Sequence, residues 1–287
     1  MKALIFFIFY FCAASLMAAL VSFPLYEIVG SNEFEFERWV ARCTLLFLLL
    51  SLVVCMRFFN ISLNSIGFNA SYHKTFRQLC TSFAIGFFIL GLIIFSLLYL
   101  DIRVVSASAE ISFSLLLKAL LVGLIIALVE ETLFRGLFFT LASLWHSSLI
   151  AVLLSSFFYA ILHFIKPIQH ADQQALNFFS GFEVITNAFA GLSSMHFDDF
   201  LALFIVGVFL ALVRLKTQSL IHCIGLHASW IFLIKTSKTL SDHNPLSDWV
   251  FLTGQYNGII GLLSFMWLSI VSAVFYFRAV RRPVSTV

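Results

Sequence analysis

The sequence has very little charge. Only 11% of its 287 residues are Asp, Glu, Lys or Arg, whereas 61% are hydrophobic and 36 are Phe. A chain of this size cannot bury so much apolar surface in one water-soluble core, since soluble domains average roughly a quarter charged residues. The scarcity of charge therefore excludes an ordinary soluble protein, and the small net charge of +3 offers no basic surface for nucleic acid.

Other absences narrow the fold class. The apolar stretches lack the alternation of polar and apolar residues that a β-barrel requires. The five cysteines form no Cys-x-x-Cys pair and show no metal-ligand spacing, so we expect small core residues. No Pro- or Ser-rich linker, internal repeat or second soluble region is visible. The sequence predicts an all-α polytopic membrane protein, with residues 1–287 as a single membrane domain.

Eight apolar stretches are candidate membrane-spanning helices in one bundle. A helix needs about 20 residues to cross roughly 30 Å of hydrocarbon, where unpaired backbone groups are not tolerated. The stretches are 3–26, 39–59, 79–100, 119–144, 148–165, 200–215, 219–234 and 256–277. The moderately apolar stretch 178–195 is expected to form a re-entrant or interfacial helix that does not span.

The chain's ends and basic residues bear on its location. Met1 and Lys2, followed by an apolar run, resemble a secretory signal peptide, but the run stays apolar to Leu25, which favours a retained first span. Lys and Arg near the span ends are slightly more numerous on the side shared by both termini, which predicts a cytoplasmic location for that side. The short basic ends and the lack of an organelle-type presequence favour a bacterial inner membrane.

Three ionisable residues interrupt the fourth span. Glu130, Glu131 and Arg135 lie among Leu, Ile, Val, Ala and Phe. A charge in hydrocarbon costs several kcal/mol unless it is paired or hydrated, so such a group usually marks a functional site. Glu131 and Arg135 are four residues apart on one helical face, in the favourable order for an ion pair. Glu130 points about 100° away and is a candidate general acid or base.

Two histidines in later spans are candidate partners of Glu130. If the fourth and fifth spans form an antiparallel hairpin, Glu130 and His163 both lie roughly 21 to 23 Å from its turn, at ~1.5 Å per residue. They would then share a membrane depth. His227, counted from the turn before the seventh span, lies about 14 Å into the layer, which is roughly 8 Å shallower. His222, on another face of that helix, is more consistent with an interfacial or structural residue.

Three motifs follow one another on separate spans. They are Glu-Glu-x-x-x-Arg at Glu130, Glu131 and Arg135, aromatic-x-x-x-His at Tyr159 and His163, and Gly-Leu-His-Ala-x-Trp at 225–230, which contains His227. Together they resemble the CPBP family of CAAX-protease and bacteriocin-processing intramembrane endopeptidases, also called the Abi family. The resemblance covers roughly residues 115–234, which would be the core of the membrane domain.

The resemblance implies a glutamic-type intramembrane protease. Glu130 would activate water together with His163, Glu131 and Arg135 would support the site, and His227 would help to stabilise the tetrahedral oxyanion. Peptide hydrolysis needs such a base, plus hydrogen-bond donors aimed at the developing oxyanion. No cofactor and no metal is implied, and the partners would be a membrane-tethered protein or peptide substrate and the lipid bilayer.

Two positions depart from the family's motifs. The aromatic residue four positions before His163 is usually Phe, and here it is Tyr159, whose added hydroxyl needs a partner. Four positions after the third-motif His the family commonly carries Asn or another polar residue, whereas this chain has Ile231, which cannot donate a hydrogen bond. Asn187 and Asn257 are candidate substitutes. Without a substitute, losing such a donor lowers the rate by about 10²- to 10³-fold.

Other functions stay open on the same residues. Glu130 or Glu131 with His163 and His227 could bind a divalent ion that activates water, although no His-Glu-x-x-His helix supports this and the neighbouring arginine disfavours a cation. A catalytically silent scaffold or immunity-type membrane protein would explain the apolar residue at the donor position. A proton-coupled transporter is less favoured, since no inverted repeats are visible.

Overall fold

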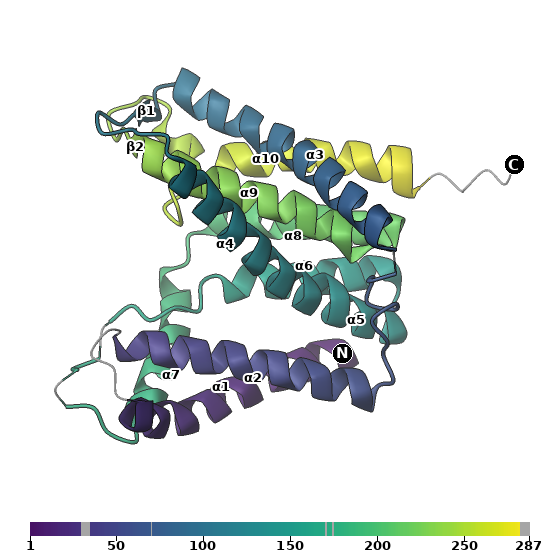
Figure 1. Ribbon diagram of the computed structural model, residues 1–287, viewed down its shortest axis with the longest axis vertical. Coiled ribbons are helices and arrows are strands. Elements are labelled where there is room, and N and C mark those ends of the chain that lie inside the picture. The colour runs from purple at the N-terminus through teal and green to yellow at the C-terminus, as the bar shows by residue number, and fades with distance from the viewer. Residues whose placement is uncertain (30–34, 70, 170, 174, 282–287) are drawn as a thin grey trace, which may run out of the picture. The chain divides into compact units, whose positions relative to one another are not determined.

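Helices make up most of the protein (Figure 1). The computed structural model describes residues 1–29, 35–69, 71–169, 171–173 and 175–281. Within these residues, seven helices are long and apolar enough to cross a membrane, and the 15-residue apolar helix α6 (Ser148–Leu162) is shorter. The predicted all-α class is confirmed, and the expected count of about eight spans agrees with seven long helices plus α6.

The chain divides into two compact units, which are described separately. The first unit contains Met1–Ser62 and Ile161–Met195, and the second contains Leu63–Ala160 and His196–Val287.

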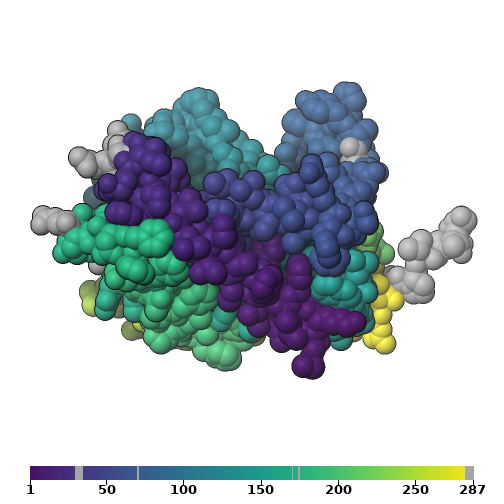
Figure 2. Space-filling model, turned by 90° about the horizontal axis from the view of Figure 1, so that it is seen from below, coloured from purple at the N-terminus to yellow at the C-terminus, as the bar shows by residue number. Residues whose placement is uncertain are grey.

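In the first unit, helix α1 (Lys2–Val29) packs along α2 (Phe36–Phe58), and α7 (Ser180–Ala190) lies against α1. Figure 2 shows α1 and α2 in purple to blue with the green α7 region beside them. α7 has only 11 residues and is followed by a short 3-10 helix, η2 (Gly191–Ser194). Since 11 residues rise only about 16 Å, α7 by itself is shorter than the hydrocarbon layer, which agrees with the expectation of a helix that does not span.

The second unit is built around α9 (Leu220–Leu240), which packs against α3 (Tyr72–Tyr99), α4 (Phe113–Glu131) and α8 (Phe197–Thr217) (Figure 1). Its elements, in chain order, are α3 (Tyr72–Tyr99), β1 (Arg103–Val105), α4 (Phe113–Glu131), the π-helix η1 (Thr132–Phe138), α5 (Phe139–Trp145), most of α6, α8 (Phe197–Thr217), α9, β2 (Ser241–His243), the 3-10 helix η3 (Val250–Leu252), α10 (Leu262–Phe275) and the π-helix η4 (Tyr276–Val280). α10 packs along α8. α9 is therefore the central helix of this unit.

Two features of the second unit were not expected from the sequence. The short strands β1 and β2 pair antiparallel, with Val104 opposite Asp242, and join the loop after α3 to the loop after α9. Arg103 at the start of β1 is buried, which lowers the pKa of its guanidinium, and its Nε donates to Ser241 Oγ at 2.8 Å. The last apolar stretch was predicted to begin at residue 256, but α10 begins at Leu262, so that 256–261 form a loop.

Candidate active site

The fourth predicted span is one continuous helix that changes its winding at the Glu-Glu motif. It runs over 33 residues, from Phe113 to Trp145. The α-helical winding ends at Glu131, and the π-helix η1 begins at Thr132. A π-helix bonds residue i to i+5, and short π segments inside longer helices occur frequently at functional sites. The two glutamates of the motif therefore lie where the α-helix gives way to the π-helix, and Arg135 lies within the π-helix itself.

Glu131 is completely buried and binds two side chains through one oxygen. Its Oε1 accepts a hydrogen bond from Arg135 Nη1 at 2.9 Å and lies 2.8 Å from His227 Nδ1. Arg135 is also completely buried, and its Nη2 donates to the carbonyl of Gly207 on α8 at 3.4 Å. Buried charges are tolerated when they are paired and hydrogen-bonded in this way. The ion pair predicted from the i, i+4 spacing of Glu131 and Arg135 is confirmed.

Glu130 lies on the more exposed side of the same cluster. Its side chain is 28% exposed, and its Oε2 lies 3.9 Å from Nε2 of His227. The imidazole of His227 thus stands between two carboxylates, with Nδ1 directed to Glu131 and Nε2 directed to Glu130. Because a carboxylate oxygen accepts, Nδ1 is the nitrogen that donates to Glu131.

The predicted difference in depth between His227 and Glu130 is wrong. Counting residues from two separate turns gave a gap of roughly 8 Å, whereas the two side chains lie 3.9 Å apart. The count assumed that both turns lie at one level and that every residue rises as in an α-helix. Instead, α9 packs lengthwise against α4, and the π-helix η1 separates Glu130 from the turn that served as its reference.

Tyr159 on α6 covers a further side of the cluster. It is 2% exposed, and its ring centroid lies 4.2 Å from Cζ of Arg135, a cation–π contact. The ring also meets Phe134 at 5.4 Å and His227 at 6.0 Å, both edge-on. The structure therefore brings together Glu130, Glu131, Arg135, His227 and Tyr159 from the span that holds the Glu-Glu motif, from α6 and from α9.

His163 lies directly after the last residue of α6, Leu162, and its side chain is half-buried. It belongs to the first unit, whereas Glu130 belongs to the second. Its pairing with Glu130 therefore stays a prediction.

Ile231 has an apolar environment. It packs with a buried cluster of residues from α4 and α9 that includes Ala127 and Ala228, and Leu124 packs against the same cluster. The position one helical turn after His227 therefore offers no hydrogen-bond donor to the site.

The two asparagines considered as substitutes have local structural roles. Asn187 on α7 donates to the carbonyl of Gln169 at 3.0 Å and accepts from the amide of Ile168 at 3.1 Å. Asn257 lies in the loop before α10, not in a span, and its Oδ1 accepts from the amides of residues 259 and 260 at 3.0 and 2.8 Å. Both side chains thus bind the backbone of their own surroundings.

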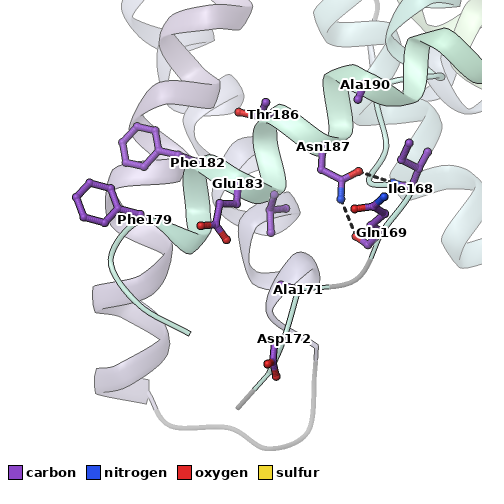
Figure 3. A pocket seen from close by; sticks show the side chains of 11 residues that line it. Ile168, Gln169, Ala171, Asp172, Phe179, Phe182, Glu183, Thr186, Asn187 and Ala190 are labelled. Carbon is purple, nitrogen blue, oxygen red and sulfur yellow. Dashed lines mark hydrogen bonds between the residues drawn. The ribbon is translucent and has the colours of Figure 1, made fainter. Parts of the chain in front are cut away.

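A cavity of about 620 Å³ lies in the first unit, between α7 and the segment before it. Figure 3 shows Glu183 and Asn187 of α7 at this cavity, with Asn187 hydrogen-bonded to Ile168 and Gln169. None of the predicted catalytic residues lines it.

Sequence reasoning missed the loop before α10. Asp199, 1% exposed at the start of α8, accepts through Oδ2 from the amides of Gln255 at 3.1 Å and Tyr256 at 3.0 Å. A side chain on Gly254 would meet Asp199 Oδ1 at 1.8 Å, so only glycine fits. Burial, and then the nearby carboxylate of Glu130, raise the pKa of Tyr256 to about 12. The closely spaced glycines of 254–261 were the available signal for this loop.

The fold and the buried Glu, Arg and His cluster define a multi-pass integral membrane protein with ionisable groups gathered inside its helices. Residues 112–233 match the family described as Rce1-like, Type II CAAX prenyl endopeptidase Rce1-like. The resemblance to the CPBP family is thereby confirmed over this segment, and the match supports a CAAX-type intramembrane protease acting on membrane-associated peptides. No curated protein and no solved structure matches the chain significantly.

Proposed function

We propose that the protein is a glutamic-type intramembrane endopeptidase that hydrolyses a peptide bond of a membrane-associated protein or peptide. The observation that supports this most directly is the position of His227, 2.8 Å from Glu131 and 3.9 Å from Glu130. Arg135 neutralises Glu131, whereas Glu130 lies outside that ion pair and is partly exposed. Glu130 is therefore the carboxylate of the pair that water can reach.

In this proposal Glu130 is the general base. It takes a proton from a water molecule that it shares with His163, and the water oxygen attacks the scissile carbonyl carbon. The electron pair of the C=O bond moves to oxygen, and His227, donating from Nε2 in its protonated form, stabilises that oxyanion. When the C–N bond breaks, Glu130 returns the proton to the leaving amine.

The substrate class follows from the proposed orientation of the chain. With both termini in the cytoplasm, the turn at residues 146–147 is cytoplasmic and the Glu130 cluster lies nearer the external face. An exported, membrane-tethered peptide in a bacterial inner membrane fits this orientation better than a cytosolic prenylated protein. A prenylated CAAX peptide, named in the description of the matching family, is the alternative to test beside it.

The test is cleavage of such peptides by the protein purified in nanodiscs, with two matched pairs of variants. Glu130→Gln and His163→Ala are expected to lose nearly all activity, because each removes a group that activates water. Glu110→Gln changes an exposed glutamate in the loop before α4, and His222→Ala changes the other histidine of the first half of α9. Both controls are expected to keep wild-type activity.

Each outcome separates the candidates. Full activity in Glu130→Gln would contradict the glutamic mechanism, and no cleavage of any peptide by the wild type would favour the silent scaffold. Loss of activity with a chelator, restored by Zn²⁺, would favour the metal-dependent variant.

A further inference from the structure

Trp230 ends the third motif, three residues after His227, and has no part in the proposed chemistry. Its side chain is 4% exposed, and its Nε1 donates a hydrogen bond to the carbonyl of Gly86 on α3 at 2.9 Å. Gly86 lies inside α3, whose backbone pattern already uses that carbonyl, so the indole is an additional donor to it. What this bond adds is a directional link between α3 and α9.

The indole of Trp230 also packs against α8. The centroids of its ring and of the Phe209 ring lie 6.0 Å apart. Two residues earlier on α8, the carbonyl of Gly207 accepts a hydrogen bond from Nη2 of Arg135. Trp230 therefore holds α9 to α3 by a hydrogen bond and to α8, which itself binds the Glu-Glu motif's arginine, by ring packing.

Glycines bring the neighbouring helices close to α9 on both sides of His227. A side chain on Gly86 of α3 would meet the Cα of Leu226 at 2.9 Å, and one on Gly123 of α4 would meet the carbonyl of Ala228 at 2.8 Å. Such contacts set the distance between helices, but a glycine presents no side chain that interlocks with its partner. A hydrogen bond has a preferred direction, which the apolar contacts lack. The Trp230 bond therefore restrains the rotation of α9.

The position of His227 depends on this rotation. Its Nδ1 lies 2.8 Å from Glu131 and its Nε2 lies 3.9 Å from Glu130, so the imidazole has to meet both carboxylates at once. Side chains end about 5–6 Å from a helix axis, so a rotation of ~10° moves the imidazole by about 1 Å. A displacement of about 1 Å in a catalytic group can lower a rate by about 10²-fold.

We propose that Trp230 is a positioning residue of the candidate site: its bond to the Gly86 carbonyl fixes the rotation of α9 and so holds His227 between Glu131 and Glu130. The proposal rests on the function proposed above, in which His227 stabilises the oxyanion. Trp230 acts through α9 and not on the substrate.

A second tryptophan provides a matched control. Trp267 of α10 donates from Nε1 to the carbonyl of Ile89 on α3 at 3.0 Å, which is the same kind of bond to the same helix. α10 carries none of the proposed catalytic residues. In the cleavage assay, Trp230→Phe is expected to lower kcat by about 10-fold with KM unchanged. Trp267→Phe is expected to lower the melting temperature by a similar amount but to keep wild-type kcat.

A second measurement needs no cleavage. In protein labelled with ¹⁵N-histidine, the NMR signal of the His227 Nδ1 proton, assigned by its loss in His227→Ala, reports the bond to Glu131. This signal is expected to move in Trp230→Phe and to stay in place in Trp267→Phe. An analogue of tryptophan at position 230 with sulfur in place of the indole N–H keeps the shape and removes only the donor. It covers the case in which Trp230→Phe does not fold.

The outcomes distinguish this inference from the proposed function. Wild-type kcat in Trp230→Phe, or an unmoved His227 signal with the sulfur analogue, would overturn the positioning role. Equal losses of kcat in Trp230→Phe and Trp267→Phe would also overturn it, because they would show a general loosening of the helices on α3. If Glu130→Gln is active, the proposed function fails, and the NMR signal still tests the link between Trp230 and His227.

Discussion

Glu131 is the residue on which the geometry of the candidate site depends most. One of its oxygens binds both Arg135 and His227, at 2.9 and 2.8 Å, and the residue has no exposed surface. The bond to Nδ1 orients the imidazole, so that Nε2 faces Glu130. Glu131 therefore acts on the proposed chemistry by positioning His227, and Arg135 acts by neutralising Glu131.

Arg135→Met is expected to destabilise the protein by about 3–5 kcal/mol, because it leaves the buried carboxylate of Glu131 without its ion-pair partner. The double variant Glu131→Gln/Arg135→Met should be less destabilised, since it removes both charges together. The free energy of unfolding, from denaturant titration in detergent, measures both effects. Arg77→Met at an exposed arginine of α3 is the control and should change little. Equal stability of Arg135→Met and wild type would show that the pair contributes nothing.

The residues of the site differ in how far the sequence could reveal them. The pair of Glu131 and Arg135 was predictable because i, i+4 spacing on a helix fixes a local contact. The contact of His227 with both glutamates was not, because it depends on how α9 packs against α4. Asp199 was missed for the same reason: its partners, the amides of Gln255 and Tyr256, lie 56 and 57 residues away.

At the scale of elements, α3 and α9 are joined by a close contact of small residues. A side chain on Gly86 of α3 would meet Ser229 Oγ at 2.3 Å, and one on Gly225 of α9 would meet Ser82 Oγ at 2.1 Å. The two helices thus approach through one glycine each. Small residues allow such close packing of membrane helices, where no hydrophobic effect drives them together. This contact fixes the helix that carries His227.

Gly86→Ala and Gly225→Ala are each expected to destabilise the protein by about 1–3 kcal/mol, because the added methyl group forces α3 and α9 apart. Gly91→Ala is the matched control on the same helix, since no atom lies within 4 Å of its added methyl. It should be neutral or stabilising by up to about 1 kcal/mol, from helix propensity. Melting temperatures in detergent measure the three variants. Equal shifts in Gly86→Ala and Gly91→Ala would contradict the close contact.

Long apolar runs predicted the spanning helices well, because a helix is the main way for such a segment to satisfy its backbone in lipid. Their ends were less predictable, as α10 shows by beginning at Leu262. The π-helix η1 was not detectable, because residue types do not distinguish bonding from i to i+5 from the ordinary α-helical pattern. The strands β1 and β2 are too short to show any alternation.

At the scale of the whole molecule, the family match and the compact units do not coincide. The matched residues 112–233 belong partly to the second unit and partly, through Ile161–Met195, to the first. The matched residues do not include α3, which contacts α9 closely at Gly86. They also do not include α10, which packs along α8. A fragment limited to the matched residues would therefore expose the packed faces of α8 and α9.

The number of membrane crossings determines whether the two termini lie on the same side of the membrane. If α6 crosses together with the seven long helices and α7 does not, the number of crossings is even and both termini lie on one side of the membrane. Epitope tags fused to each end should therefore both be detected only after cells are permeabilised, since the basic residues predict cytoplasmic termini. A tag inserted in the loop before α4 should be accessible in intact cells. One accessible and one protected terminus would show an odd number of crossings, which would mean that α6 does not cross.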